Sequence, residues 1–196
     1  MRRCAVVLLL LLLSACGPAM VQADVTRFTT LPPGGGGGVT ILPDQGQKGS
    51  LEFQQYADLV AAELAQLGWR PVPASADADA VVFLHWGVGS PTTQVWQSPS
   101  AWGGWGGGPW YGGVYQTFPY YDTYSRTLWP KWLAVEIFDG PRWRAGERLS
   151  RFEGRAVAEG SHPAIAPAMP YLVKAMFTGF PGTSGQTVRV SVPEAP

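Results

Sequence analysis

The stretch AVVFLHWGV at residues 80–88 decides the fold class, because it is apolar almost without interruption. A strand of this composition must be covered on both faces, which predicts a central position in a sheet. WLAVEIFD (132–139) is a second such stretch, and RLSRFEGRAVA (148–158) follows it after a Gly140-Pro141 turn. We therefore expect these last two stretches to pair as an antiparallel hairpin.

Helical periodicity appears in two further stretches. Ser50 can cap a helix of about 18 residues whose apolar side chains recur every three or four positions, and Gly68 suits its end. PYLVKAMFT (170–178) predicts a second helix, with a proline at its start and Gly179 after it. Together these elements predict an α+β domain, in which an antiparallel-rich mixed sheet carries two helices on one face.

Shorter strands are expected over residues 24–31, 39–42, 69–72 and 187–192. The run Gly34–Gly38 separates the first two of them. A phosphate-binding glycine loop must open a helix, whereas a strand follows this run. We therefore interpret the run as a loose hairpin connection between the strands at 24–31 and 39–42.

The N-terminus is typical of a secretion signal. MRR (1–3) is basic, and the apolar run at 4–13 is too short for a bilayer span, which needs about 20 residues. The run ends in LSAC (13–16), which closely resembles a bacterial lipobox. The resemblance implies cleavage after Ala15, with a diacylglycerol thioether and a further acyl chain such as palmitate on Cys16. The alternative is an ordinary signal peptide with a cysteine after the cut.

Three consequences follow for the organisation of the chain. Residues 1–15 are predicted to be a cleaved signal peptide, 16–23 a lipidated tether and 24–196 a single domain. Cys4 and Cys16 are the two cysteines of the sequence, so the mature domain would hold no disulfide and no cysteine ligand. Gly17, where the sorting pattern would place Asp for inner-membrane retention, favours the periplasmic face of the outer membrane, with the inner membrane as the alternative.

Charge and composition restrict the function classes. The 196 residues carry 14 basic and 14 acidic side chains, which is a poor basis for nucleic-acid binding. We expect no cofactor, and no metal site, because His85 and His162 are isolated. We interpret His85 as a histidine of the sheet core or edge, and His162 as solvated.

A catalytic constellation is not evident, so we expect a non-enzymatic protein. No G-x-S-x-G motif occurs in the sequence. Paired carboxylates could support hydrolysis, but we expect Glu136 to lie opposite Arg151 and to form a cross-strand ion pair. A hydrolase that uses Glu136 or His85 is the less favoured alternative.

The segment 90–128 is the unusual part of the sequence, with many aromatic residues interleaved with glycines. We expect an irregular insertion. It could be a floppy loop, a contact surface for an envelope protein or the bilayer face, or a platform that stacks sugars. The candidate binding residues are Trp102, Trp105, Trp110, Tyr111 and Tyr115.

Five stretches occur in an order that resembles a bacterial lipoprotein family known only as domain of unknown function 4136. They are DVTRF (24–28), SLEFQQYA (50–57), ADAVV (78–82), FEGR (152–155) and MPYLVKAMFTGFPG (169–182). The resemblance implies an envelope lipoprotein with a mixed α/β fold, and it transfers no catalytic residue. We expect a lipid-anchored protein with a structural, assembly or protein-interaction role. The alternative is a module that binds glycan or lipid through the aromatic segment.

Overall fold

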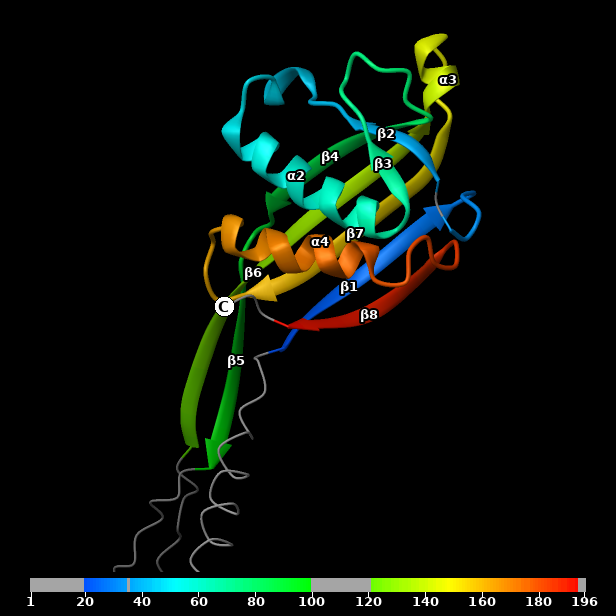
Figure 1. Cartoon of the computed structure of the whole chain (residues 1–196). Coiled ribbons are helices and arrows are strands. Elements are labelled where there is room, and N and C mark those ends of the chain that lie inside the picture. The colour runs from blue at the N-terminus through cyan, green and yellow to red at the C-terminus, as the bar shows by residue number, and fades with distance from the viewer. Residues whose placement is uncertain (1–19, 35, 100–120, 194–196) are drawn as a thin grey trace, which may run out of the picture.

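The computed structural model describes residues 20–34, 36–99 and 121–193. Within them the chain forms one sheet, in the order β3-β2-β4-β6-β7-β1-β8, with β5 paired to one end of β6 (Figure 1). The strands are β1 Met20–Thr29, β2 Gly37–Ile41, β3 Trp69–Pro71, β4 Ala80–Val88, β5 Thr92–Pro99, β6 Tyr121–Asp139, β7 Ser150–Gly160 and β8 Gln186–Pro193. The helices are α2 Leu51–Gln66, α3 Gly140–Arg144 and α4 Met169–Phe177, with single 3-10 turns at Gln45–Gln47 and Ala166–Ala168.

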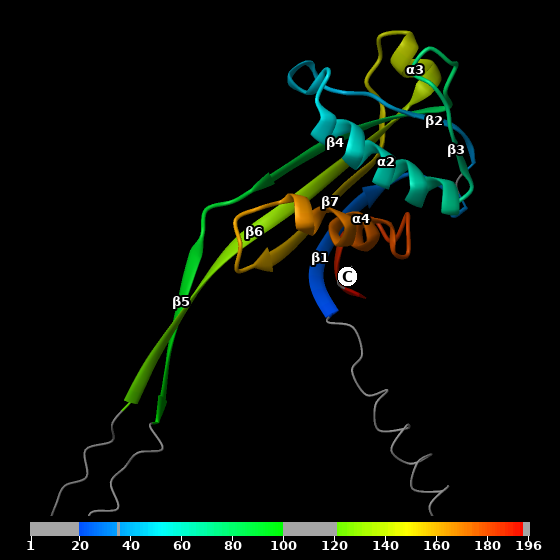
Figure 2. The ribbon, with the colours of Figure 1, turned by 60° about the vertical axis from the view of Figure 1, so that its left-hand side comes forward.

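The predicted α+β architecture is confirmed. The sheet is mostly antiparallel, and α2 and α4 cover the same face of it (Figures 1 and 2). β4 lies inside the sheet between β2 and β6, and β6 pairs with β7, as the apolar runs indicated. Ser50 caps α2 by accepting a hydrogen bond from Phe53 N at 3.2 Å. The short helix α3 at Gly140–Arg144 stands where we expected only a turn.

The predicted hairpin between the first two strands is wrong. β1 pairs with β7 and β8, whereas β2 lies on the other side of the sheet and runs parallel to β3 and β4. The glycine-rich stretch therefore carries the chain across the sheet instead of folding it back. Its far end is held by Asp79, whose carboxylate accepts a hydrogen bond from Gly38 N at 2.6 Å. A Cβ at Gly37, where φ is 105°, would lie 2.6 Å from that carboxylate, so this approach requires glycine.

Two predicted boundaries also need correction. β1 begins at Met20, so residues 20–23 belong to the sheet and not to a tether. The flanks of the segment 90–128 are not irregular, because β5 and the first half of β6 form a regular antiparallel ribbon. Thr, Val, Tyr and Trp are common in these flanks, and their preference for strands outweighs the neighbouring glycines. Residues 100–120 lie outside the described residues.

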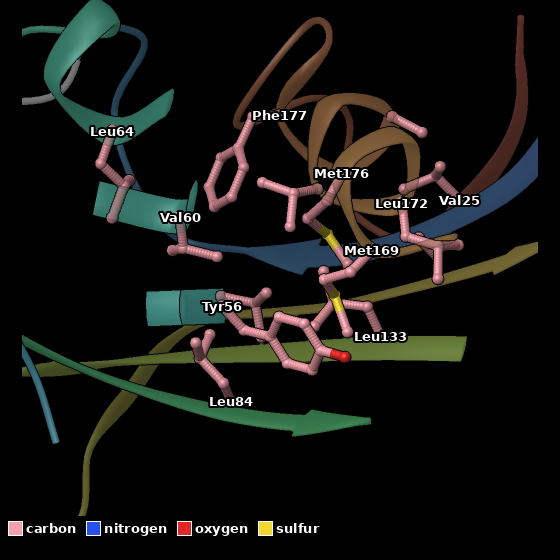
Figure 3. Packing of buried hydrophobic residues seen from close by; sticks show 14 of the residues in the cluster. Val25, Tyr56, Val60, Leu64, Leu84, Leu133, Met169, Leu172, Met176 and Phe177 are labelled. Atoms are coloured by element: carbon pink, nitrogen blue, oxygen red, sulfur yellow. The ribbon is translucent and has the colours of Figure 1, made fainter. Parts of the chain in front are cut away.

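The main core lies between the sheet and the pair of helices (Figure 3). The apolar stripe of α2 meets α4 over the central strands, and Tyr56 packs edge-to-face on Trp86 with ring centroids 5.0 Å apart. A second, smaller cluster on the opposite face places Trp143 of α3 against Phe83 and Phe138. The side chains labelled in Figure 3 are Val25, Tyr56, Val60, Leu64, Leu84, Leu133, Met169, Leu172, Met176 and Phe177.

Candidate functional site

The ribbon of β5 and the first half of β6 projects beyond the part of the sheet that the helices cover (Figure 2). Eight residue pairs join the two strands, from Thr92 opposite Leu128 to Pro99 opposite Tyr121. Among the described residues, no third strand pairs with either side of the ribbon. With respect to the described residues, both of its edges therefore present unpaired backbone N–H and C=O groups.

Large apolar and aromatic side chains are exposed on this ribbon. Val95 is 63% exposed, and Trp96 and Tyr124 are each 48% exposed. Trp96 and Tyr124 face one another across the strands and stack, with ring centroids 6.0 Å apart and planes 19° apart. Such cross-strand pairs stabilise a ribbon by about 0.2–1 kcal/mol, but a lone two-stranded ribbon is only marginally stable in water. The ribbon is therefore suited to contact with another surface.

The ribbon leaves the sheet at the end where β1 begins (Figures 1 and 2). The register agrees, because Asp24 of β1 lies across β7 from Trp132, and both Met20 and the ribbon extend beyond this row. The candidate lipid-bearing Cys16 lies outside the described residues, four positions before Met20. The ribbon and the start of the described chain thus share one end of the molecule.

A hollow of about 530 Å³ lies near the base of the ribbon, beside the turn that precedes α4. Lys131 enters it from β6, Arg126 from the ribbon and His162 from the loop after β7. We did not predict this site, although the sequence carries its signal: Lys131 is in phase with Leu133, Val135 and Ile137, which fill the core. A lysine at a core-facing strand position is uncommon, because buried lysines are usually paired with an anionic group.

The face of the sheet opposite α2 and α4 carries the residues considered for hydrolysis. Glu136 lies directly opposite Glu153, not Arg151, so the predicted ion pair is wrong. Arg151 instead pairs with Asp139 at 3.3 Å. The pairing differs from our expectation because α3 lengthens the connection and a register irregularity follows Ile137.

His85 lies on the same face but is engaged elsewhere. Its Nδ1 is 3.4 Å from the Asp44 carboxylate, and the side chain is about a third exposed, so it is not a core histidine. The hollow that includes Glu136 is lined by residues of β1, β6 and β7 and does not include His85. The geometry of the described residues therefore gives no shared cleft to Glu136 and His85.

Two side-chain contacts order the face of the sheet opposite α2 and α4, called here the open face. Arg189 donates hydrogen bonds of 2.8 and 3.0 Å to the Asp24 carboxylate, and these hold the pKa of Asp24 below its usual value. The guanidinium of Arg155 lies 4.5 Å from the ring centroid of Trp132. Both arrangements are typical of an ordered sheet surface.

Several of the predicted site residues are not among the residues that the structure describes. Cys16 and the candidate binding residues Trp102, Trp105, Trp110, Tyr111 and Tyr115 all lie outside the described residues. In residues 20–34, 36–99 and 121–193, no group of three His, Cys, Asp or Glu side chains could hold a metal ion. No helix in the same ranges is long and apolar enough to cross a membrane.

Comparison with known proteins gives a family. The model described as Domain of unknown function (DUF4136) matches residues 23–182. The chain belongs to this family. No curated protein matches it. A solved structure, described as a PDZ domain protein from Parabacteroides distasonis ATCC 8503, is similar with a TM-score of 0.45 and 9% identity. The match covers 93% of this chain and 41% of that one, so the chain spans less than half the length of the solved protein.

The family match includes most of β1 and every element from β2 to α4, whereas β8 lies outside it. It begins at Ala23 in β1 and ends at Gly182, just after the cis peptide bond between Phe180 and Pro181. The ribbon falls within it, and so do all the residues that line the Lys131 hollow except Val21. The family description assigns no function to either place.

Proposed function

We propose that this chain is a lipid-anchored protein of the bacterial envelope, attached through Cys16, and that it works without catalysis by binding another envelope protein through the ribbon. The LSAC sequence at residues 13–16 supports the anchor, which we assign to the periplasmic face of the outer membrane. The observation that carries the binding role is the projecting ribbon with its exposed Trp96–Tyr124 pair.

A protein partner fits this ribbon better than the interior of a membrane. Unpaired backbone groups are costly in hydrocarbon, and both ribbon edges carry them. A strand from a partner would satisfy one edge by strand addition, and aromatic side chains would supply the anchoring contacts. The described part of the ribbon is also rich in Thr, Ser and Gln, which suits a wet protein interface.

Site-specific photo-crosslinking in cells tests this role. We expect a crosslinker at Val95 to give one discrete adduct with an envelope protein. A crosslinker at Leu51, which is 80% exposed at the start of α2, should not give this adduct. The adduct should be lost when Trp96 and Tyr124 are both replaced by Ser. Its persistence in that double variant, or equal adducts from both positions, would contradict the proposal.

Purified partner protein provides the second arm. Once the adduct is identified by mass spectrometry, the two purified full-length proteins should bind in a neutral detergent. The Trp96→Ser/Tyr124→Ser variant should bind about thirtyfold more weakly, which corresponds to about 2 kcal/mol for a pair of aromatic anchors. Replacing exposed Phe28 on the open face by Ser is the matched control and should leave affinity unchanged.

A further inference from the structure

Lys131 occupies a position that the sheet otherwise reserves for the core. It is 5% exposed, and the next side chains in phase along β6, Leu133 and Val135, are fully buried. Taking an ammonium group out of water is costly unless an anion compensates for the lost hydration. An anionic group near the ammonium of Lys131 is therefore expected.

The described residues do not supply that anion. The ion pairs among them join other side chains, and no carboxylate of residues 20–34, 36–99 or 121–193 comes within 4.0 Å of Lys131 Nζ. Burial accordingly lowers the pKa of Lys131 from its ordinary value. The ammonium lies over Gly160, where a Cβ would be only 2.5 Å from Nζ. Glycine at this position makes room for the charge.

The surroundings of Lys131 combine positive charge with apolar walls. Arg126 and His162 line the same hollow of about 530 Å³, and among the described residues that line it Glu159 is the one acidic side chain. Glu159 is exposed at the surface, where solvent screens its charge. Ala168, which precedes the first residue of α4, brings the positive end of that helix to the wall.

Apolar side chains from β1 and from the loop before α4 form another part of the wall of this hollow. Val21, Ala164 and Pro167 form part of the wall. A second hollow of about 540 Å³ adjoins the first and shares Val21, Arg126 and Glu159 with it. The space is thus larger than a single anion requires, and Val21, Ala164 and Pro167 give the first hollow an apolar wall beside the lysine.

We propose that this hollow binds an anionic amphiphile, with a phosphate or carboxylate head on Lys131 and Arg126 and a hydrocarbon chain against Val21 and Pro167. The head would compensate for the buried ammonium, and the chain would bury apolar surface. The site uses side chains on β1, β6, the ribbon and the turn before α4, and it does not need the acylation of Cys16.

Calorimetric titration of the full chain in a neutral detergent tests the site. The probes are hexyl phosphate, hexanoate, inorganic phosphate and hexanol. We expect hexyl phosphate and hexanoate to bind, inorganic phosphate to bind at least about tenfold more weakly, and hexanol not to bind. Equal affinity for hexyl phosphate and inorganic phosphate would overturn the apolar half of the proposal. Absence of binding by both organic anions would overturn all of it.

Matched variants separate a specific site from general attraction. Lys131→Met keeps the apolar length of the side chain and should weaken hexyl phosphate binding at least about tenfold. Gly160→Ala should also weaken it, because the new methyl group displaces Nζ while the charge remains. Lys48→Met removes the same charge from an exposed site and should bind like the native chain. Equal weakening by Lys48→Met, or none by Lys131→Met, would overturn the proposal.

One variant keeps this proposal independent of the anchor. Cys16→Ser should bind hexyl phosphate with unchanged affinity. If the chain proves not to be anchored through Cys16, or not to bind a partner through the ribbon, hexyl phosphate should still bind. Loss of hexyl phosphate binding in Cys16→Ser would show that the site needs the acylated chain and would overturn the proposal as stated.

Discussion

Arg27 connects the sheet to the end of helix α4. It is 5% exposed, and its guanidinium donates hydrogen bonds of 2.8–3.1 Å to the carbonyl oxygens of Ala175, Met176 and Thr178. The last carbonyl groups of a helix lack partners within it, and the negative end of the helix dipole attracts a cation. The arginine of DVTRF (24–28) thus has a structural role.

Removing this cation should destabilise the fold. We expect Arg27→Met to lower the free energy of unfolding by about 3 kcal/mol, because buried carbonyl oxygens lose charged donors. Arg27→Lys should restore only part of the loss, since a single ammonium nitrogen cannot bond all three carbonyl oxygens that the planar guanidinium reaches. Urea denaturation of the purified chain in detergent measures both. A loss below about 1 kcal/mol in Arg27→Met would show that the contacts contribute little.

Lys131 has the opposite effect on stability. Its pKa in the folded chain is lowered from 10.5 by burial, so between the lowered pKa and 10.5 the unfolded chain binds more protons. Stability therefore rises with pH across that window, and the cost of burying the charge is largest below it. Lys131→Met should raise Tm near neutral pH by about 2–4 °C, which is about 1 kcal/mol at this length.

The pH dependence of the gain in Tm shows whether the buried charge of Lys131 causes that gain. The advantage of Lys131→Met over the native chain should shrink as pH rises through the lowered pKa toward 10.5, because the native lysine then loses its charge. Thermal unfolding at a series of pH values measures the difference. A difference that does not change with pH would assign the gain to packing and not to the charge.

At the scale of elements, the apolar runs were the reliable guide. Residues 80–88 lie in β4 and residues 132–139 in β6, both inside the sheet, and Ser50 and Gly68 bound α2, because each signal acts locally. The expected cover on both faces is only partly present, because side chains of β6 on the face away from α2 and α4, such as Trp132 and Glu136, are half-buried. The partner of β2 was not predictable in this way. The glycine-rich stretch permits both a hairpin and a crossing, and the crossing is accompanied by contacts between residues distant in sequence, such as those of β2 with β4 and of Gly38 with Asp79.

The candidate sites were only partly readable for related reasons. The aromatic composition of residues 90–128 pointed to a contact segment, but its flanks are polar enough to conceal the strands that present Trp96 and Tyr124. Lys131 was visible as a charge in phase with core residues. That it enters a hollow depends on the loop at Gly160 and the turn before α4, whose positions the sequence pattern does not determine.

The ribbon should be dispensable for folding. Trp96→Ser with Tyr124→Ser removes a stacked pair that rests on no other described element, so we expect the free energy of unfolding to fall by less than about 1 kcal/mol. Circular dichroism during urea denaturation measures this change, with Phe28→Ser as the control. A larger loss would show that the ribbon belongs to the folding unit, and effects on partner binding would then be indirect.

At the scale of the whole molecule, the proposed anchor at Cys16 would decide where the ribbon and the hollow operate. We expect Cys16→Ser to abolish incorporation of labelled palmitate and to release the chain from the membrane fraction, because two or three acyl chains make attachment effectively permanent. Cys4→Ser changes the other cysteine and should leave both readouts intact. Retention of label and membrane fractionation in Cys16→Ser would contradict the proposed anchor.

The pairing of β1 with β8 has a practical consequence for experiments on this protein. Met20 lies directly opposite Pro193, so the first and last described residues are neighbours across a strand spacing of about 4.8 Å. A fluorescent or affinity tag joined directly to Pro193 would begin at the corner of the sheet where β1 begins. An insertion at Gly146, in the connection after α3 near the other end of the sheet, would keep the tag away from that corner.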